Sequence, residues 1–129
     1  MRAVKNEFAR MDMDQRLATI EEDGWQLDDG EAIGEAHPET FWVPPLEARQ
    51  ALQAGQLVKL IFRIVTTDEQ DREEQHVERM WVAVTGREGD LYSGELDNQP
   101  YCTEEMAPGM PLWFESRHVI NIHSDGDEE

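Results

Sequence analysis

The feature that most constrains the fold is a change of hydrophobic period directly after Gly55. In the segment QLVKLIFRIV, apolar residues recur at every second position, with Val58 and Phe62 on one side and Lys59 on the other. Successive side chains of a β-strand point to opposite faces, so this alternation predicts a strand with one fully buried face. The same alternation returns in RMWVAVT, at residues 79–85, which predicts a second strand.

Three shorter segments are also predicted to be strands, at residues 91–96, 112–114 and 119–123. Turn-forming residues precede or follow them, including the Asp97-Asn98 pair and Pro108-Gly109. Strands that cluster after the helices and are joined by short turns favour an antiparallel sheet with helices on one face or end. The predicted class is therefore α+β, with a sheet of about five strands.

Two helices are predicted before these strands. Residues 7–22 are rich in helix formers and place apolar residues at helical spacing, which predicts an N-terminal helix. The Pro44-Pro45 pair opens a short helix at about 45–54, because proline is tolerated in the first turn and Gly55 stands where a left-handed residue ends a helix. Residues 25–41 show no regular period and are predicted to be irregular.

Acidic residues outnumber basic ones by 29 to 11, so the formal net charge is −18. Binding to nucleic acid depends on Lys and Arg side chains that displace counterions from phosphates. The charge therefore argues against a nucleic-acid partner. Adsorption to an anionic membrane surface is disfavoured for the same reason.

The negative charge is concentrated in three segments. Residues 21–47 contain nine acids and no base, residues 67–78 form a second acidic run, and residues 124–129 form an acidic tail. Segments of low hydrophobicity and like charge usually remain solvated. We therefore expect a mobile loop near 67–77 and a disordered tail at 124–129.

Length and cysteine content are those of a single small intracellular domain. A chain of 129 residues has the commonest size of one domain. Cys102 is the only cysteine, so no intrachain disulfide can form. Residues 1–20 lack the apolar core of a secretory signal, and no apolar stretch has the length of a membrane helix. We therefore predict a cytoplasmic protein.

Four segments follow one another in a distinctive order, FWVPPLEARQALQAGQLVKLIF, ERMWVAVTG, YSGELDNQP and PGMPLWFESRHVINI. This ordered set resembles bacterial domain-of-unknown-function family 2314 over about residues 36–123. The resemblance implies a small α+β domain with a strongly bent, barrel-like antiparallel sheet. Because members and related small domains occur among candidate immunity proteins of bacterial toxin systems, it also implies protein binding.

The resemblance suggests how the chain is divided. Residues 1–35, which it does not cover, would form the N-terminal helix and an acidic irregular segment. Residues 36–123 would form the family-like domain, and residues 124–129 the disordered tail. Features peculiar to this protein are therefore expected in the first segment.

Several acidic, aromatic and amide side chains are candidates for contact with a protein partner, namely Trp25, Asp28, Asp29, Glu31, Glu35, Trp81, Asp97 and Asn98. Trp81 would either pack under the 45–54 helix or be an exposed anchor, since aromatic residues are favoured hot spots. The Asp97-Asn98 pair is first a turn former. Trp42 and Trp113 lie in apolar runs, which predicts that they pack in the core or at its rim.

The sequence does not predict an enzyme. Cys102 is followed by Glu104 and Glu105, whose charges would raise the pKa of its thiol and oppose a nucleophilic role. His118 and His123 are five positions apart, an odd separation that puts them on opposite faces of a continuous strand and prevents them from sharing a metal ion without a bend. The common metal, phosphate-binding and nucleophile motifs do not occur. We therefore predict no catalytic residue, no metal and no cofactor.

These observations predict a non-catalytic protein-binding module. The acidic segment at 21–39 and the loop at 68–78 would steer a basic protein and occupy the cationic cleft of that partner, with Trp25 or Trp81 supplying desolvated contact. An immunity protein that inhibits a basic toxin would be one form of this function. The alternative is a housekeeping or stress-related domain whose acidity provides only solubility or salt adaptation. Neither interpretation specifies an oligomeric state.

Overall fold

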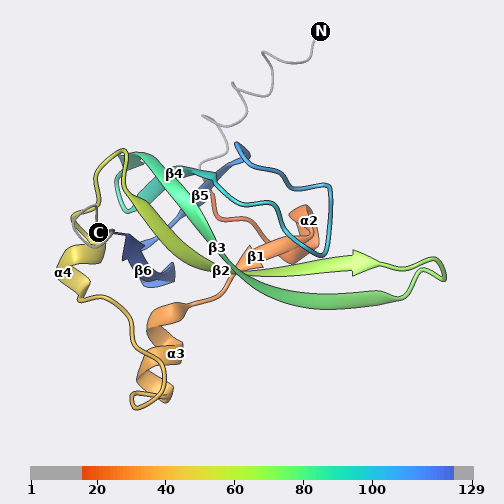
Figure 1. Cartoon of the computed structure of the whole chain (residues 1–129), viewed down its shortest axis with the longest axis horizontal. Helices are drawn as coiled ribbons and strands as arrows, with labels where there is room; N and C mark the ends of the chain where they lie inside the picture. The colour runs from red at the N-terminus through yellow and green to blue at the C-terminus, as the bar shows by residue number, and fades with distance from the viewer. Residues whose placement is uncertain (1–15, 124–129) are drawn as a thin grey trace, which may run out of the picture.

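The fold is built on one long antiparallel hairpin, seen in a computed structural model that describes residues 16–123 (Figure 1). Strands β2 (Leu57–Thr67) and β3 (Glu73–Glu88) pair without interruption from Leu57 opposite Ala83 to Thr67 opposite Glu73. The predicted alternation is confirmed in β2, because Val58, Leu60 and Phe62 are fully buried. Both strands extend beyond their buried residues, because the pairing continues past Ile64 in β2 and begins before Met80 in β3.

The remaining strands extend this hairpin on both sides. Strands β4 (Leu91–Leu96) and β5 (Pro111–Phe114) follow β3 across the sheet. On the other side, β1 (Trp25–Leu27) and β6 (Val119–His123) both pair with β2, at different parts of its length. All pairings are antiparallel, and the six-stranded sheet curls into a half-barrel (Figure 1). The predicted α+β class and bent, barrel-like sheet are confirmed.

The hydrophobic core lies on one face of the curled sheet. It collects alternate side chains of the strands, including Val58, Leu60, Phe62, Ile64, Met80, Val82, Val84, Tyr92, Leu96, Phe114 and Val119. Trp25 contacts Phe62 with 5.4 Å between ring centroids, and Tyr92 stacks on Phe114 at 5.3 Å. Such aromatic pairs add to the stabilisation from buried area.

Close approach of β3 and β4 requires a glycine at position 94. A Cβ added to Gly94 would lie 2.6 Å from Val82 Cγ1 and 2.8 Å from the carbonyl oxygen of Ala83. We therefore expect Gly94→Ala to lower the free energy of unfolding by about 2 kcal/mol, because backbone as well as side chains must move. Chemical denaturation would measure this, and Gly86→Ala, facing only the Ser93 hydroxyl, is the matched control. Equal stability of the two variants would contradict the prediction.

The predicted N-terminal helix is shorter in the part of the chain that the structure describes. Residues 7–15 lie outside the described residues, and the helical part that follows is α2 (Ile20–Asp23). The Thr19 hydroxyl accepts a hydrogen bond from the Glu22 backbone N–H, and Gly24 ends the helix at φ 81°. A side-chain cap at the start and a left-handed glycine at the end enclose a single turn.

The prediction of an irregular segment at residues 25–41 is wrong for most of residues 25–36, whereas residues 37–41 form no helix or strand. Strand β1 is followed by helix α3 (Gly30–Ala36), whose first turn is capped by the Asp29 carboxylate accepting from the Ala32 N–H at 2.9 Å. Gly30 does not break this helix. A Cβ added there would lie 2.5 Å from Ile120 Cγ2, so the glycine allows α3 to pack closely against β6.

The helix predicted at about 45–54 is reduced to one turn, α4 (Leu46–Arg49). The apolar residues of 45–54 are mostly exposed, namely Leu46 and the alanines, and of this set only Leu52, beyond the helix, is buried. The backbone N–H of Leu52 donates to the Tyr92 hydroxyl at 3.2 Å instead of continuing the helical ladder. This tertiary bond overrides the local helical preference.

The expected mobile loop at 67–77 is instead the end of the β2–β3 hairpin. The ladder continues to Thr67 and Glu73, and a short turn joins the strands. In that turn the Asp68 carboxylate accepts from the backbone N–H groups of Gln70 and Arg72, at 2.8 and 2.9 Å. Figure 1 shows this end projecting from the body of the sheet. Local side-chain bonds and the cross-strand ladder therefore order a segment whose charge suggested disorder.

Two further expectations concern the ends of the chain and membranes. The predicted disordered tail at 124–129 lies outside the described residues. Within residues 16–123, no helix is both long enough and apolar enough to cross a membrane.

Candidate functional site

Three of the predicted partner-binding carboxylates form ion pairs within the chain. The pairs are Asp28 with Arg63 at 2.8 Å, Asp29 with Arg117 at 3.2 Å, and Glu31 with Arg49 at 3.2 Å. The bond to Asp28 raises the pKa of the Arg63 guanidinium. Bases from other elements therefore pair with these three acids of the base-free segment, which are not free charges facing a partner.

Two other candidates from that segment, Trp25 and Glu35, lie in different environments. Trp25 is only 9% exposed and packs on Phe62, so it belongs to the core and cannot supply contact to a partner. Glu35 is exposed in the last turn of α3, where the structure gives it no ion pair. Of these two candidates, only Glu35 is accessible to a partner.

Trp81 matches neither of its two predicted environments. It is half-buried, with Lys59 Nζ 4.8 Å from its ring centroid and the His123 ring at 5.9 Å in an edge-on arrangement. Its backbone holds the turn after β4: the Trp81 N–H donates to Asn98 Oδ1, and the Asp97 N–H donates to the Trp81 carbonyl. The Asp97-Asn98 pair is a turn former that fastens its turn to β3.

The other two tryptophans have opposite outcomes. Trp113 is buried in β5, as predicted. Trp42 is 72% exposed, so the prediction that it packs in the core or at its rim is wrong. Apolar neighbours in sequence were misleading because residues 41–45 are not a strand or helix and bury only Pro44.

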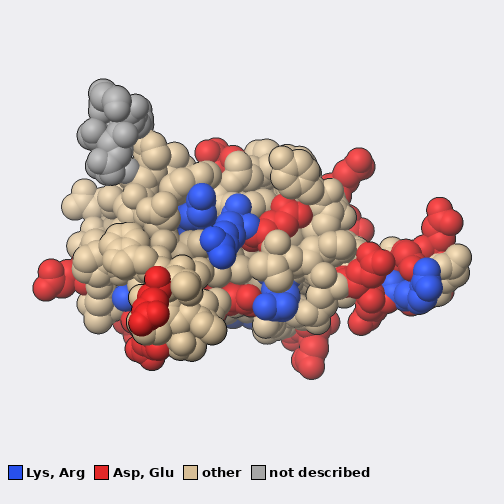
Figure 2. All heavy atoms as spheres, turned by 60° about the horizontal axis from the view of Figure 1, so that its bottom comes forward, with Lys and Arg blue, Asp and Glu red and all other residues tan. Residues whose placement is uncertain are grey.

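The projecting part of the hairpin, residues 65–75, is the strongest acidic feature of the described chain. It contains the acids Asp68, Glu69, Asp71, Glu73 and Glu74 and the single base Arg72. Arg72 pairs with Asp68 at 2.8 Å, and the backbone N–H of Arg72 is the main cause of the lowered pKa of Asp68. The other four carboxylates are exposed. Figure 2 shows acidic side chains clustered along this projection.

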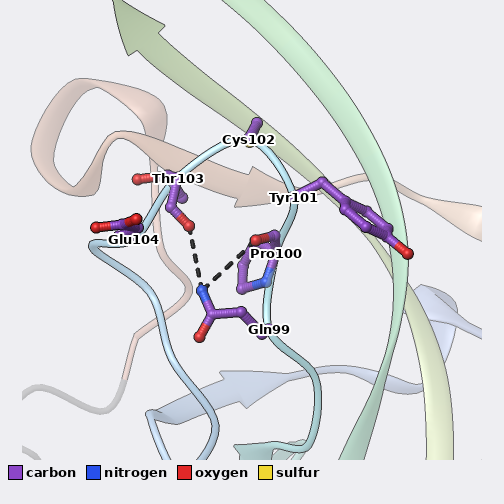
Figure 3. Close-up of a pocket in the computed structure, with 6 residues that line it drawn as sticks. All are labelled: Gln99, Pro100, Tyr101, Cys102, Thr103 and Glu104. Atoms are coloured by element: carbon purple, nitrogen blue, oxygen red, sulfur yellow. Dashed lines mark hydrogen bonds between the residues drawn. The ribbon is translucent and has the colours of Figure 1, made fainter.

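A second feature, the loop at residues 99–104, lies against β3 where the projection meets the body. The Glu78 carboxylate accepts hydrogen bonds from the backbone N–H groups of Tyr101 and Cys102, each at 3.0 Å. The Gln99 amide turns back into the loop and donates to the Thr103 carbonyl at 3.2 Å (Figure 3). The ring of Tyr101 extends away from the loop and is 100% exposed. The loop therefore presents a tyrosine on a firmly held backbone.

The same loop makes Cys102 a poor nucleophile. Burial, followed by its hydrogen bond with Glu78, raises the pKa of the Cys102 thiol to about 11. The thiol is therefore protonated at neutral pH, whereas nucleophilic cysteines need a lowered pKa. The predicted direction is confirmed, but the responsible carboxylate is Glu78 and not Glu104 or Glu105.

The histidines do not form a metal site with the other described residues. His118 is buried in the 3-10 helix η1 (Ser116–His118), and His123 ends β6, so the two are not on a continuous strand as expected. Nδ1 of His118 accepts a hydrogen bond from the Glu115 N–H at 2.9 Å. Between residues 16 and 123, no three His, Cys, Asp or Glu side chains are grouped so that they could hold a metal ion.

Comparison with known protein families, with characterised proteins and with solved structures returned no match to this chain. The resemblance to family 2314 stays a prediction.

Sequence reasoning did not identify Glu78 or Tyr101. Tyr101 follows a proline in a polar stretch after the Asp97-Asn98 turn, which could have marked it as an exposed aromatic residue. Glu78 has no such signal, because its role depends on β3 passing beside a loop that is more than twenty residues away in sequence.

Proposed function

We propose that this protein is a non-catalytic binding module that engages a basic protein through the hairpin projection (residues 65–75). The observation that carries the proposal is the position of the acidic residues. The projection extends beyond the body of the sheet and carries four exposed carboxylates, of which only Glu74 has a basic neighbour within the described residues, the His76 ring at 3.7 Å. A two-stranded projection of this shape is suited to a cleft on another protein.

Electrostatics and the neighbouring loop support this function. Complementary charge steers two proteins together and raises the association rate, and its range is about 10 Å at 0.1 M salt. Tyr101 lies beside Glu78 at the base of the projection, where it would supply desolvated contact. Tyrosine is enriched among the residues that contribute most to binding energy. The projection would provide attraction, and Tyr101 the short-range affinity.

The partner class follows from the charge. A basic toxin, such as a nuclease with a cationic cleft, fits this surface, and the protein would then act as its immunity protein. A cytoplasmic location is part of the proposal and is supported by the single cysteine. A toxin gene adjacent to the gene for this chain would identify the partner. The competing proposal, that the acidity provides only solubility, gives the projection no special role.

The test compares two variants that lose equal charge. One neutralises the projection through Glu69→Gln, Asp71→Asn, Glu73→Gln and Glu74→Gln. The control neutralises exposed acids elsewhere through Glu47→Gln, Glu88→Gln, Asp90→Asn and Glu95→Gln. The unchanged protein and each variant are used to capture basic proteins, at about 0.05 M salt, from an extract of the cells that naturally produce this protein. The captured protein is then purified, and its affinity for each chain is measured.

We expect one basic protein to bind with 1:1 stoichiometry. The projection variant should bind it at least about tenfold more weakly, and the control variant should differ by less than about twofold. The affinity of the unchanged chain should also fall as salt is raised. An equal loss in the two variants, or failure to capture a basic protein, would favour solubility as the only role of the acidity.

A further inference from the structure

A small hollow on the outer face of the sheet is lined by two cations. Its volume is about 220 Å³, and it is bordered by Phe41, Trp42, Lys59, Arg79, Ile120 and Asn121, with Thr40 at its margin. None of these residues is acidic. Figure 2 shows Lys and Arg side chains near the middle of the face that is turned forward, with Asp and Glu side chains beside them. In a protein with a net charge of −18, a hollow lined by two cations and no acid differs in sign from the protein as a whole.

The strand register brings the residues of the hollow together. Lys59 on β2 lies opposite Trp81 on β3 and opposite Asn121 on β6, so these three side chains form a row across the sheet. Arg79 lies on the same face of β3, two residues before Trp81 and opposite Ile61 on β2. Between Lys59 and Leu60 the pairing with β6 shifts by one residue, which leaves Ile120 as an extra residue of β6. Bulges of this kind re-aim side chains and are common beside binding sites.

Neither cation has an anionic partner among residues 16–123. Lys59 Nζ lies over the Trp81 ring at 4.8 Å, and the Arg79 guanidinium lies over the Phe41 ring at 5.5 Å. Within residues 16–123, these are the two Lys or Arg side chains that take part in no hydrogen bond and no ion pair, whereas the arginines at positions 16, 49, 63, 72, 87 and 117 all do. Carboxylates are abundant in this chain, so two adjacent cations that remain without one are positioned for an external anion.

We propose that this hollow binds a small aromatic oxyanion, that is, a carboxylate or phosphate attached to a planar ring. The oxyanion would lie between Lys59 and Arg79, where the fork of the guanidinium and the ammonium group can both donate hydrogen bonds to it. The ring would stack on Trp42, which is 72% exposed and borders the hollow. The Asn121 amide supplies a further polar group at the rim.

Size and charge both limit the ligand to a small molecule. Pockets for drug-sized ligands have volumes of about 300–1,000 Å³, so a hollow of about 220 Å³ suits a single ring with one charged group. A polyanion would extend beyond the two cations and meet the negative charge of the surrounding protein. This site is independent of the hairpin projection and would be retained if the proposed function failed.

The test uses phenyl phosphate and benzoate as aromatic oxyanions, inorganic phosphate as an anion without a ring, and benzylamine as a ring without negative charge. Binding is followed through the indole N–H resonances of Trp42 and Trp81 in the full chain. The variants are Lys59→Met, Arg79→Gln and Trp42→Ala. The matched control is Arg87→Gln, because Arg87 is also a cation over an aromatic ring, 4.9 Å from the centre of Tyr92, but lies outside the hollow.

At least one aromatic oxyanion should bind with a dissociation constant near or below about 1 mM. The stronger of the two identifies phosphate or carboxylate as the preferred group. Lys59→Met and Arg79→Gln should each weaken binding by about tenfold or more, and Arg87→Gln should leave it unchanged. Trp42→Ala should weaken the aromatic ligands but not inorganic phosphate. Equal binding of benzylamine, equal loss in the Arg87→Gln variant, or no saturable shift in either indole would overturn the proposal.

Discussion

Replacing Arg49 by methionine is expected to lower the free energy of unfolding by about 3 kcal/mol. Arg49 is 4% exposed, and its guanidinium donates to the carbonyl oxygens of Pro44 and Ser116, at 2.8 and 3.1 Å, while pairing with Glu31. Methionine fills a similar volume but leaves these two carbonyls without a donor. The loss should be large because one side chain joins α3, α4 and η1.

Two controls separate the hydrogen bonds from the charge. Arg49→Lys keeps the positive charge but cannot reach both carbonyls with a rigid fork, so it should recover less than half of the loss. Glu31→Gln removes only the partly exposed partner and should cost less than about 1 kcal/mol. Urea denaturation measures all three variants. A loss below about 1 kcal/mol for Arg49→Met would contradict the assigned role.

Acidification is expected to destabilise the protein through His118. Burial, with the nearby Arg117 charge, lowers the pKa of His118 from its ordinary value of 6.5 to about 4. Between these two values the unfolded chain binds the proton and the folded chain does not, so the free energy of unfolding falls as the pH falls. The contribution of His118 is fully present above pH 6.5, and about 3 kcal/mol of it should be lost by pH 4.

The His118→Asn variant isolates this contribution from the titration of the many carboxylates. Asparagine keeps an oxygen that can accept from the Glu115 N–H but does not ionise in this range. The free energy of unfolding of both proteins is measured between pH 7.5 and pH 4, and the difference between them is the result. It should shrink by about 3 kcal/mol as pH falls. A difference independent of pH would contradict the neutral, buried histidine.

The strands could be predicted from sequence more completely than the helices. Alternation in β2 is a local signal, and the buried residues Val58, Leu60 and Phe62 follow from it directly. The predicted helix at 45–54 is too long, because the Leu52 N–H donates to the Tyr92 hydroxyl, forty residues away in sequence. Helix α3 was missed because residues 25–41 show no regular hydrophobic period, and the contact with Ile120 that requires Gly30 in its first turn is not visible in the sequence.

The candidate surfaces were predictable only in part. The charge of residues 67–78 marked the hairpin projection as important, although its regular structure was not foreseen. The charge of residues 21–39 was misleading, because Arg63 and Arg117 neutralise Asp28 and Asp29 from distant positions. The pairing of Lys59 with Trp81 depends on strand register, which a single-strand pattern does not contain. Long-range pairing therefore decides which charges remain free.

Hydrogen exchange of the protein, alone and bound to its basic partner, tests the central claim most directly. Binding through the hairpin projection predicts slower exchange of backbone amides in residues 65–78 and in the loop at 97–104 that presents Tyr101. Exchange in α3 and β4 should be unchanged. Protection confined to α3 or β4, with none in the projection, would contradict the proposed mode of binding.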